Sequence, residues 1–182
     1  FCAYELIHAK KDLKVLMIEK GRRIENRECP KRKTKVCVGC KPCSITTGFA
    51  GAGAFSDGKL SLSPDVGGNL PEILGYDKTV ELLKESDDIY LKFGADSKVY
   101  GVDKEKEIRE IRRKAIMANL KLIECPIRHL GTEEGYKIYS RLQEHLLEEG
   151  VEMEFGTMVK DIIIEDNQVK GVITDKDETY TA

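Results

Sequence analysis

The sequence contains no tryptophan, only three histidines and five prolines, and no long apolar run. A membrane helix needs roughly 20 consecutive apolar residues, and no stretch approaches that length. Thirty basic residues oppose 32 acidic ones, so the net charge of −2 creates no overall field that would attract nucleic acid or an anionic membrane surface. The N-terminus also lacks the basic and apolar regions of a signal peptide. We therefore expect a soluble, cytoplasmic protein that binds neither nucleic acid nor membrane.

The chain has 182 residues, of which 41% are hydrophobic and 34% are charged. This composition is typical of a globular protein with one domain or slightly more. Residue 1 is Phe rather than Met, and residues 179–182 lie in a β-prone run. We expect the chain to be a fragment of a longer protein.

The pattern of apolar residues predicts a mixed α/β protein. Helical spacing occurs over residues 1–11, 77–93, 103–119 and 132–149, and strand patterns occur over 14–19, 151–155, 158–165, 169–175 and from 179 onward. Residues 20–75 are rich in loop signals, and the turn-like residues 166–168 join the strand patterns 158–165 and 169–175. Gly150 stands where a glycine commonly ends a helix. We expect a discontinuous domain formed by residues 1–75 and 129–182, interrupted by a helical insert over residues 76–128.

A short apolar run over residues 14–19, typical of a strand that is buried on both faces of a parallel sheet, ends at Glu19. In dinucleotide-binding βαβ units the second strand ends in an acidic residue that binds the ribose, about 20 residues after a glycine-rich turn. Counting back from Glu19 places that turn before Phe1. The alternative is a buried strand that ends in an ordinary exposed carboxylate.

Residues 48–60 are rich in glycine and alanine. Small residues allow the backbone to approach a phosphate closely, which is typical of a cofactor pyrophosphate or flavin contact. The alternative is a plain flexible loop. A P-loop is disfavoured because Leu60 occupies the position of the magnesium-binding Ser or Thr.

Four of the six cysteines crowd into one loop, at Cys29, Cys37, Cys40 and Cys43. Two successive C-x-x-C spacings could bring four thiolates to one zinc ion or one iron–sulfur cluster. Neighbouring basic residues lower thiol pKa values, which favours metal binding and redox reactivity alike. The hypotheses left open are a metal centre, a redox-active dithiol and reduced cysteines without a ligand.

These motifs, in this order, resemble the FAD-dependent dehydrogenases of the two-dinucleotide-binding-domain flavoprotein superfamily, and within it a bacterial group. The resemblance is most specific over residues 48–60, whose core at residues 53–60 reads Gly-Ala-Phe-Ser-Asp-Gly-Lys-Leu. Other matching segments are 15–22, the cysteine stretch 29–43, 129–132, 142–153, 156–162 and 169–172. The resemblance is weak only over residues 70–128.

The resemblance implies an incomplete Rossmann-like FAD-binding domain with a C-terminal β-hairpin region, whose first strand and glycine-rich turn are missing. It implies an oxidoreductase that transfers hydride or electrons through FAD between a small-molecule substrate and an electron donor. Glu19 would bind the adenosine ribose, and Val159 would offer backbone contacts to the adenine. The other residues implied near the cofactor are Lys20, Arg22, Gly51, Ala52, Gly53, Ser56 and Asp57.

Two further expectations follow. The alternative function is a non-catalytic module that binds metal or senses redox state through the four cysteines. For either function, the apolar residues 15–18 lie on a sheet that would otherwise be exposed. We expect them to be covered by residues of a longer chain or by another copy of this chain through self-association. We expect the fragment alone to bind FAD weakly or not at all.

Overall fold

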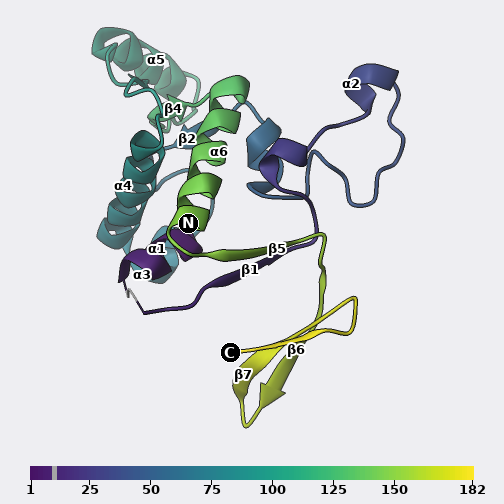
Figure 1. Ribbon diagram of the computed structural model, residues 1–182. Coiled ribbons are helices and arrows are strands. Elements are labelled where there is room, and N and C mark those ends of the chain that lie inside the picture. The colour runs from purple at the N-terminus through teal and green to yellow at the C-terminus, as the bar shows by residue number, and fades with distance from the viewer. Residues whose placement is uncertain (10–11) are drawn as a thin grey trace. The chain divides into compact units, whose positions relative to one another are not determined.

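The computed structural model describes residues 1–9 and 12–182, and it is a mixed α/β protein as the sequence predicted (Figure 1). The chain divides into two compact units, one formed by residues 1–55 and 139–182 and the other by residues 56–138. The second unit is therefore longer at both ends than the predicted insert 76–128. No helix in the described part of the chain has the length and apolar character of a membrane span.

The first unit is built on a parallel pair of strands. Strand β1 (Leu16–Glu19) pairs with β5 (Glu152–Phe155), and the register matches Leu16 with Glu152 and Glu19 with Phe155 (Figure 1). We predicted a fully buried strand, but Leu16 is exposed and the other three residues are half-buried. The reason is that β1, within the described residues, pairs with a neighbour on one side only.

Helices supply the core of this unit. Helix α1 (Cys2–Ala9) opens the chain, and the second part of α6 (Thr132–Glu148) leads into β5. The predicted glycine after α6 is confirmed: Gly150 has φ = 87°, and the next amide, of Val151, donates to the Leu146 carbonyl. The buried apolar side chains of this unit include Ala3, Tyr4, Ile24, Leu142, Leu146 and Val151.

The C-terminal part of the first unit is an antiparallel sheet. It comprises β6 (Val159–Glu165), β7 (Gln168–Thr174) and β8 (Thr179–Thr181), hydrogen-bonded in that order. Asp166 and Asn167 connect the first two strands with positive φ angles of 49° and 60°, which is typical of a type I′ hairpin turn. The predicted strands and the turn between them are confirmed.

Residues 20–55 contain little regular structure. They form two short 3-10 helices, η1 (Ile24–Asn26) and η2 (Gly51–Phe55), and one short helix, α2 (Lys31–Thr34), which lies on the cysteine-bearing loop. This segment was predicted to be rich in loops, and the structure confirms it.

The second unit combines helices with a small antiparallel sheet. The sheet contains β2 (Lys59–Ser61), β4 (Ile127–His129) and β3 (Val99–Tyr100), in that order. The helices are α3 (Leu70–Leu74), α4 (Tyr76–Lys92), α5 (Glu105–Met117) and the first part of α6. Helices α4 and α5 were predicted, whereas the three short strands were not.

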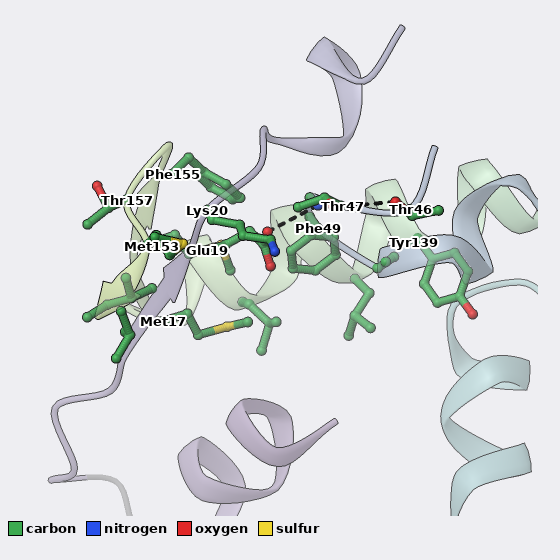
Figure 2. Close-up of a pocket in the computed structure, with 18 of the residues that line it drawn as sticks. Met17, Glu19, Lys20, Thr46, Thr47, Phe49, Tyr139, Met153, Phe155 and Thr157 are labelled. Atoms are coloured by element: carbon green, nitrogen blue, oxygen red, sulfur yellow. Dashed lines mark hydrogen bonds between the residues drawn. The ribbon is translucent and has the colours of Figure 1, made fainter. Parts of the chain in front are cut away.

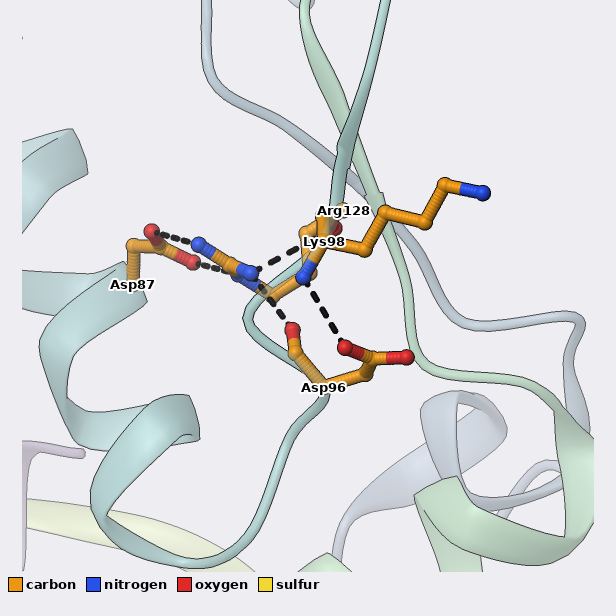
Figure 3. Close-up of polar contacts among 4 residues, drawn as sticks. All are labelled: Asp87, Asp96, Lys98 and Arg128. Carbon is orange, nitrogen blue, oxygen red and sulfur yellow. Dashed lines mark hydrogen bonds and ion pairs between the residues drawn. The ribbon is translucent and has the colours of Figure 1, made fainter.

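A buried ion pair fastens this sheet to a helix. Arg128 on β4 donates from Nε to Asp87 Oδ1 at 2.5 Å and from Nη2 to Asp87 Oδ2 at 2.7 Å (Figure 3). Its Nη1 also donates to the Asp96 carbonyl at 2.5 Å. The Asp87 carboxylate raises the pKa of Arg128, chiefly through these hydrogen bonds. The bidentate pair fixes α4 against the sheet.

Candidate functional site

A cavity of about 710 Å³ lies at the carboxyl end of β1 in the first unit. Residues 17–20, 46–51 and 157–159 line it, together with Phe1, Tyr139, Leu142, Leu146, Met153 and Phe155 (Figure 2). This volume lies within the range of roughly 300–1,000 Å³ that is typical of small-molecule and cofactor sites. In parallel α/β sheets, ligands bind outside the carboxyl ends of the strands, which is where this cavity lies.

The Glu19 carboxylate is fixed at the wall of the cavity. Its Oε1 accepts hydrogen bonds from the Gly21 amide at 2.7 Å and from the Gly48 amide at 3.1 Å. Figure 2 shows this carboxylate directed toward the 46–49 loop, beside the Phe49 ring. Within the described residues, no hydrogen bond uses Oε2, so this oxygen can accept one from a ligand.

Two glycines make this close approach of backbone segments possible. A Cβ atom added at Gly21 would lie 2.4 Å from the Gly48 nitrogen. At Gly48 the φ angle is 120°, and an added Cβ would lie 2.6 Å from Arg27 Cδ and 2.7 Å from the Arg22 carbonyl. Only glycine fits at either position without displacing the loop.

A buried arginine shapes the loop that carries Gly48. The Arg27 guanidinium donates to the carbonyls of Phe49 at 2.5 Å, Ile45 at 2.7 Å and Ser44 at 3.0 Å. Only 4% of its surface is exposed, and burial lowers the pKa of Arg27. These bonds hold residues 44–49 in the conformation that presents the Gly48 amide to Glu19. Arg27 could not be predicted from the sequence, because hydrogen bonds to main-chain carbonyls leave no sequence motif.

The rest of the wall is apolar and aromatic. Phe49, Tyr139, Met153 and Phe155 line the cavity, and all four lie outside the predicted site residues (Figure 2). The sequence did indicate which residues of α6 lie together, because Tyr139, Leu142 and Leu146 follow helical spacing and therefore share one face of the helix. Flat aromatic and apolar surfaces of this kind suit the face of a heteroaromatic ring.

The structure brings some predicted residues together and separates others. Glu19, Lys20, Gly51 and Val159 line the cavity. Arg22 lines two neighbouring depressions instead. Ala52 and Gly53 lie in η2, where the Cβ position of Gly53 is 3.1 Å from the Tyr139 hydroxyl. Ser56 and Asp57 belong to the second unit, so a cofactor contact from them stays a prediction.

The cysteines remain free thiols. Cys29 and Cys40 are half-buried, whereas Cys37 and Cys43 are exposed. Tetrahedral zinc needs four ligands, with each sulfur about 2.3 Å from the ion. Across the described residues, no group of three or more His, Cys, Asp or Glu side chains converges in this way. The structure therefore gives no support to the predicted zinc or iron–sulfur centre.

Cys43 has a distinctive environment in this loop. The amides of Ile45 and Thr46 lower the pKa of its thiol, with further contributions from the Thr46 hydroxyl and the positive charge of Arg27. A lower pKa increases the thiolate fraction near neutral pH, and the thiolate is the reactive form of cysteine.

Comparisons with known proteins give only distant likenesses. No protein-family model matches the sequence, and no curated protein matches it. One similar solved structure is L-amino acid deaminase from Proteus vulgaris with its specific insertion sequence deleted, at 13% identity and a TM-score of 0.46, covering 98% of this chain and 47% of that one. Another is L-amino acid deaminase from the same organism, at 12% identity and a TM-score of 0.44, covering 96% and 41%. This chain thus spans less than half the length of these proteins, and a likeness this distant indicates no function.

Proposed function

We propose that residues 1–55 and 139–182 form part of a Rossmann-like FAD-binding domain of a flavin-dependent oxidoreductase. The observation that carries this proposal is the Glu19 carboxylate, held by two backbone amides at the carboxyl end of a parallel strand and at the wall of a cavity. A ribose with two adjacent hydroxyls is the group that such a carboxylate binds in dinucleotide sites.

The residues around the cavity fit the adenosine half of FAD. Glu19 Oε2 would accept a ribose hydroxyl, while the Gly21 and Gly48 amides keep Oε1 in place. Phe49 and the Val159 segment would enclose the adenine, whose faces are apolar and whose edge needs backbone hydrogen bonds. Lys20 and the Gly51 amide would lie toward the pyrophosphate. FAD, when bound, supplies the hydride or electron transfer, and the protein supplies orientation and electrostatics.

The edge of β1 that does not pair with β5 fits the same proposal. Within the described residues, β1 pairs only with β5, so its other edge has main-chain groups available for a further strand. In our proposal that strand and the glycine-rich turn lie in a longer parent protein, and the turn receives the pyrophosphate. A second copy of the chain is the competing way to cover this edge, and analytical ultracentrifugation of the fragment and the parent distinguishes the two.

The test uses the full-length parent protein. Its absorbance spectrum should show a flavin after purification, and Glu19→Gln should weaken FAD binding about tenfold or more, because a hydrogen bond to a charged group contributes roughly 1.5–3 kcal/mol. Titration of the flavin-free protein with FAD, followed by flavin fluorescence, measures this change.

Glu154→Gln is the matched control. Glu154 lies on β5 between Met153 and Phe155, which line the cavity, so strand alternation directs it to the opposite face. It should leave the dissociation constant unchanged. A Glu19→Gln protein that binds FAD as tightly as the parent would remove Glu19 from the site.

A further inference from the structure

A second, smaller cavity of the first unit borders the cysteine loop. It measures about 300 Å³, and its lining includes four cationic side chains and one thiol: Lys20, Arg22, Arg27, Lys41 and Cys40. The only carboxylate in the lining is that of Glu28, which is paired with Lys33 at 2.8 Å. Arg27 is committed to the loop carbonyls. Among the described residues, no ion pair neutralises the remaining three cations, so the cavity suits an anionic ligand.

The cysteine in this cavity has a second thiol close by in sequence. Cys40 is half-buried in the lining, and Cys43 follows after two residues and is exposed. The chain turns directly after Cys43, because the Thr47 amide donates to the Cys43 carbonyl at 2.9 Å. This turn brings the amides of Ile45 and Thr46 and the charge of Arg27 to bear on the Cys43 sulfur and favours its thiolate. A C-x-x-C pair with one activated thiolate is the arrangement used in thiol–disulfide exchange.

We propose that Cys40 and Cys43 form a thiol–disulfide exchange site for an anionic low-molecular-weight disulfide, which binds over Lys20, Arg22 and Lys41. The proposal does not depend on FAD. It accounts for a cationic cavity that contains a thiol and for the free state of both cysteines. Of the three cations, only Lys20 also lines the cavity of the proposed cofactor site, whereas Arg22, Lys41 and the two cysteines do not.

The reaction proceeds in two exchanges. The Cys43 thiolate attacks one sulfur of the small disulfide, so a Cys43–sulfur bond forms, the disulfide bond breaks and the first thiolate leaves with the electron pair. Cys40, after losing its proton to water, then attacks the Cys43 sulfur and expels the second thiolate. The protein dithiol is oxidised to a Cys40–Cys43 disulfide, and the two electrons reduce the small disulfide to two thiols.

The first experiment measures stoichiometry and pairing. The reduced protein is treated with oxidised glutathione, the released glutathione is counted and the disulfide is located by peptide mapping. Two equivalents of glutathione should be released per protein, and peptide mapping should find a disulfide bond between Cys40 and Cys43. Cys40→Ser should stop at one equivalent and a mixed disulfide on Cys43, and Cys43→Ser should slow release more than tenfold.

Cys37→Ser is the matched control for this experiment, because Cys37 is an exposed cysteine of the same loop, as Cys43 is, but lies outside the proposed Cys40–Cys43 pair. It should release two equivalents at the parental rate. Release at the parental rate from Cys43→Ser, or a disulfide from Cys37 to either partner, would overturn the proposal.

The second experiment tests the charge of the ligand. Rates with oxidised glutathione, neutral hydroxyethyl disulfide and cationic cystamine are each divided by the rate of the same reagent with free cysteine. The normalised rate should be highest for oxidised glutathione, lower for hydroxyethyl disulfide and lowest for cystamine. Raising the salt concentration from 20 to 200 mM should slow the reaction with glutathione but not the reaction with neutral hydroxyethyl disulfide.

Charge variants complete this second experiment. Lys41→Gln should lower the glutathione rate severalfold and leave the hydroxyethyl disulfide rate unchanged. Lys31→Gln is the control, because Lys31 is exposed and does not line the cavity, and it should alter neither rate. Equal normalised rates for the three disulfides would overturn the proposal.

Discussion

Each of the two units buries an arginine, and the two guanidinium groups are satisfied in different ways. Arg27, in the first unit, is 4% exposed and donates only to main-chain carbonyls. Arg128, in the second unit, is 3% exposed and donates to both oxygens of the Asp87 carboxylate. The pKa shifts follow this difference: burial lowers that of Arg27, and the Asp87 partner raises that of Arg128.

This contrast separates an arginine that maintains a fold from one that shapes a site. Arg128 links a strand to a helix, so it joins elements distant in sequence. Arg27 holds six consecutive residues, 44–49, in one loop conformation, and that loop lines the cavity. Removing Arg128 should therefore cause the larger loss of stability. Removing Arg27 should cause a smaller loss of stability, but a loss of ligand binding that is larger than this loss of stability alone would explain.

The largest effect is expected for Arg128→Met. Removing one partner of a buried ion pair leaves the other charge without compensation, which costs about 3–5 kcal/mol. Urea unfolding, followed by circular dichroism, measures this loss. The double variant Asp87→Leu with Arg128→Met should be less destabilised than Arg128→Met alone, since no charge is left buried. A double variant that is less stable than both single variants would show that the ion pair itself stabilises the unit.

A smaller loss is expected for Gly48→Ala in the first unit. The added Cβ would collide with Arg27 and with the Arg22 carbonyl at a positive φ. Overpacking and backbone strain together should cost about 2–4 kcal/mol. In the second unit, Gly135→Ala on α6 is the control, because no atom lies within 4 Å of its Cβ position. The same urea titration compares them, and equal stabilities would mean that the loop does not require glycine.

Arg27→Lys should destabilise the protein by about 1–3 kcal/mol, because one ammonium group cannot reach three carbonyls and leaves buried acceptors unsatisfied. The loop should also open, which limited proteolysis within residues 44–49 detects. Arg32→Lys, on the exposed helix α2, should change stability by less than about 0.5 kcal/mol. Parental resistance to protease in Arg27→Lys would contradict the role given to Arg27 in shaping the loop.

The smallest effect concerns Cys43. Because the pKa of its thiol is lowered, more of it is thiolate at pH 7, and iodoacetamide should modify it severalfold faster than Cys37. The advantage of a lowered pKa should shrink as the pH rises above the ordinary thiol pKa of about 8.5, because an ordinary thiol is then largely ionised as well. Mass spectrometry of the two peptides over time measures the ratio. A ratio of one at pH 7 would show that the neighbouring amides do not activate Cys43.

The sequence predicted the elements that local patterns determine. Helices α4, α5 and α6 follow their apolar spacing, and the hairpin of β6 and β7 follows its strand pattern and the turn at Asp166 and Asn167. The short strands β2, β3 and β4 were missed, because two or three residues carry no periodicity of their own. In β4 the central residue is a buried arginine, which a sequence pattern reads as exposed.

The candidate site was predictable only in part. Glu19 could be found because its position at a strand end follows from the apolar run before it. Arg27 and Gly48 could not, because their roles depend on contacts with the main chain of other segments. The cysteine spacing suggested a metal, but spacing alone does not decide whether thiols converge, and in this loop they do not.

The pairing of β1 with β5 determines when the site can form during synthesis. Strand β1 ends at Glu19, and its partner begins only at Glu152, after the whole of the second unit. Residues 56–138 are one continuous stretch, so they can fold as soon as they leave the ribosome, whereas the parallel pair requires a long-range contact that forms slowly. Until then the apolar residues of β1 stay exposed. We therefore expect nascent chains that stop before residue 152 to depend most on chaperones, and the cavity to be among the last features to form.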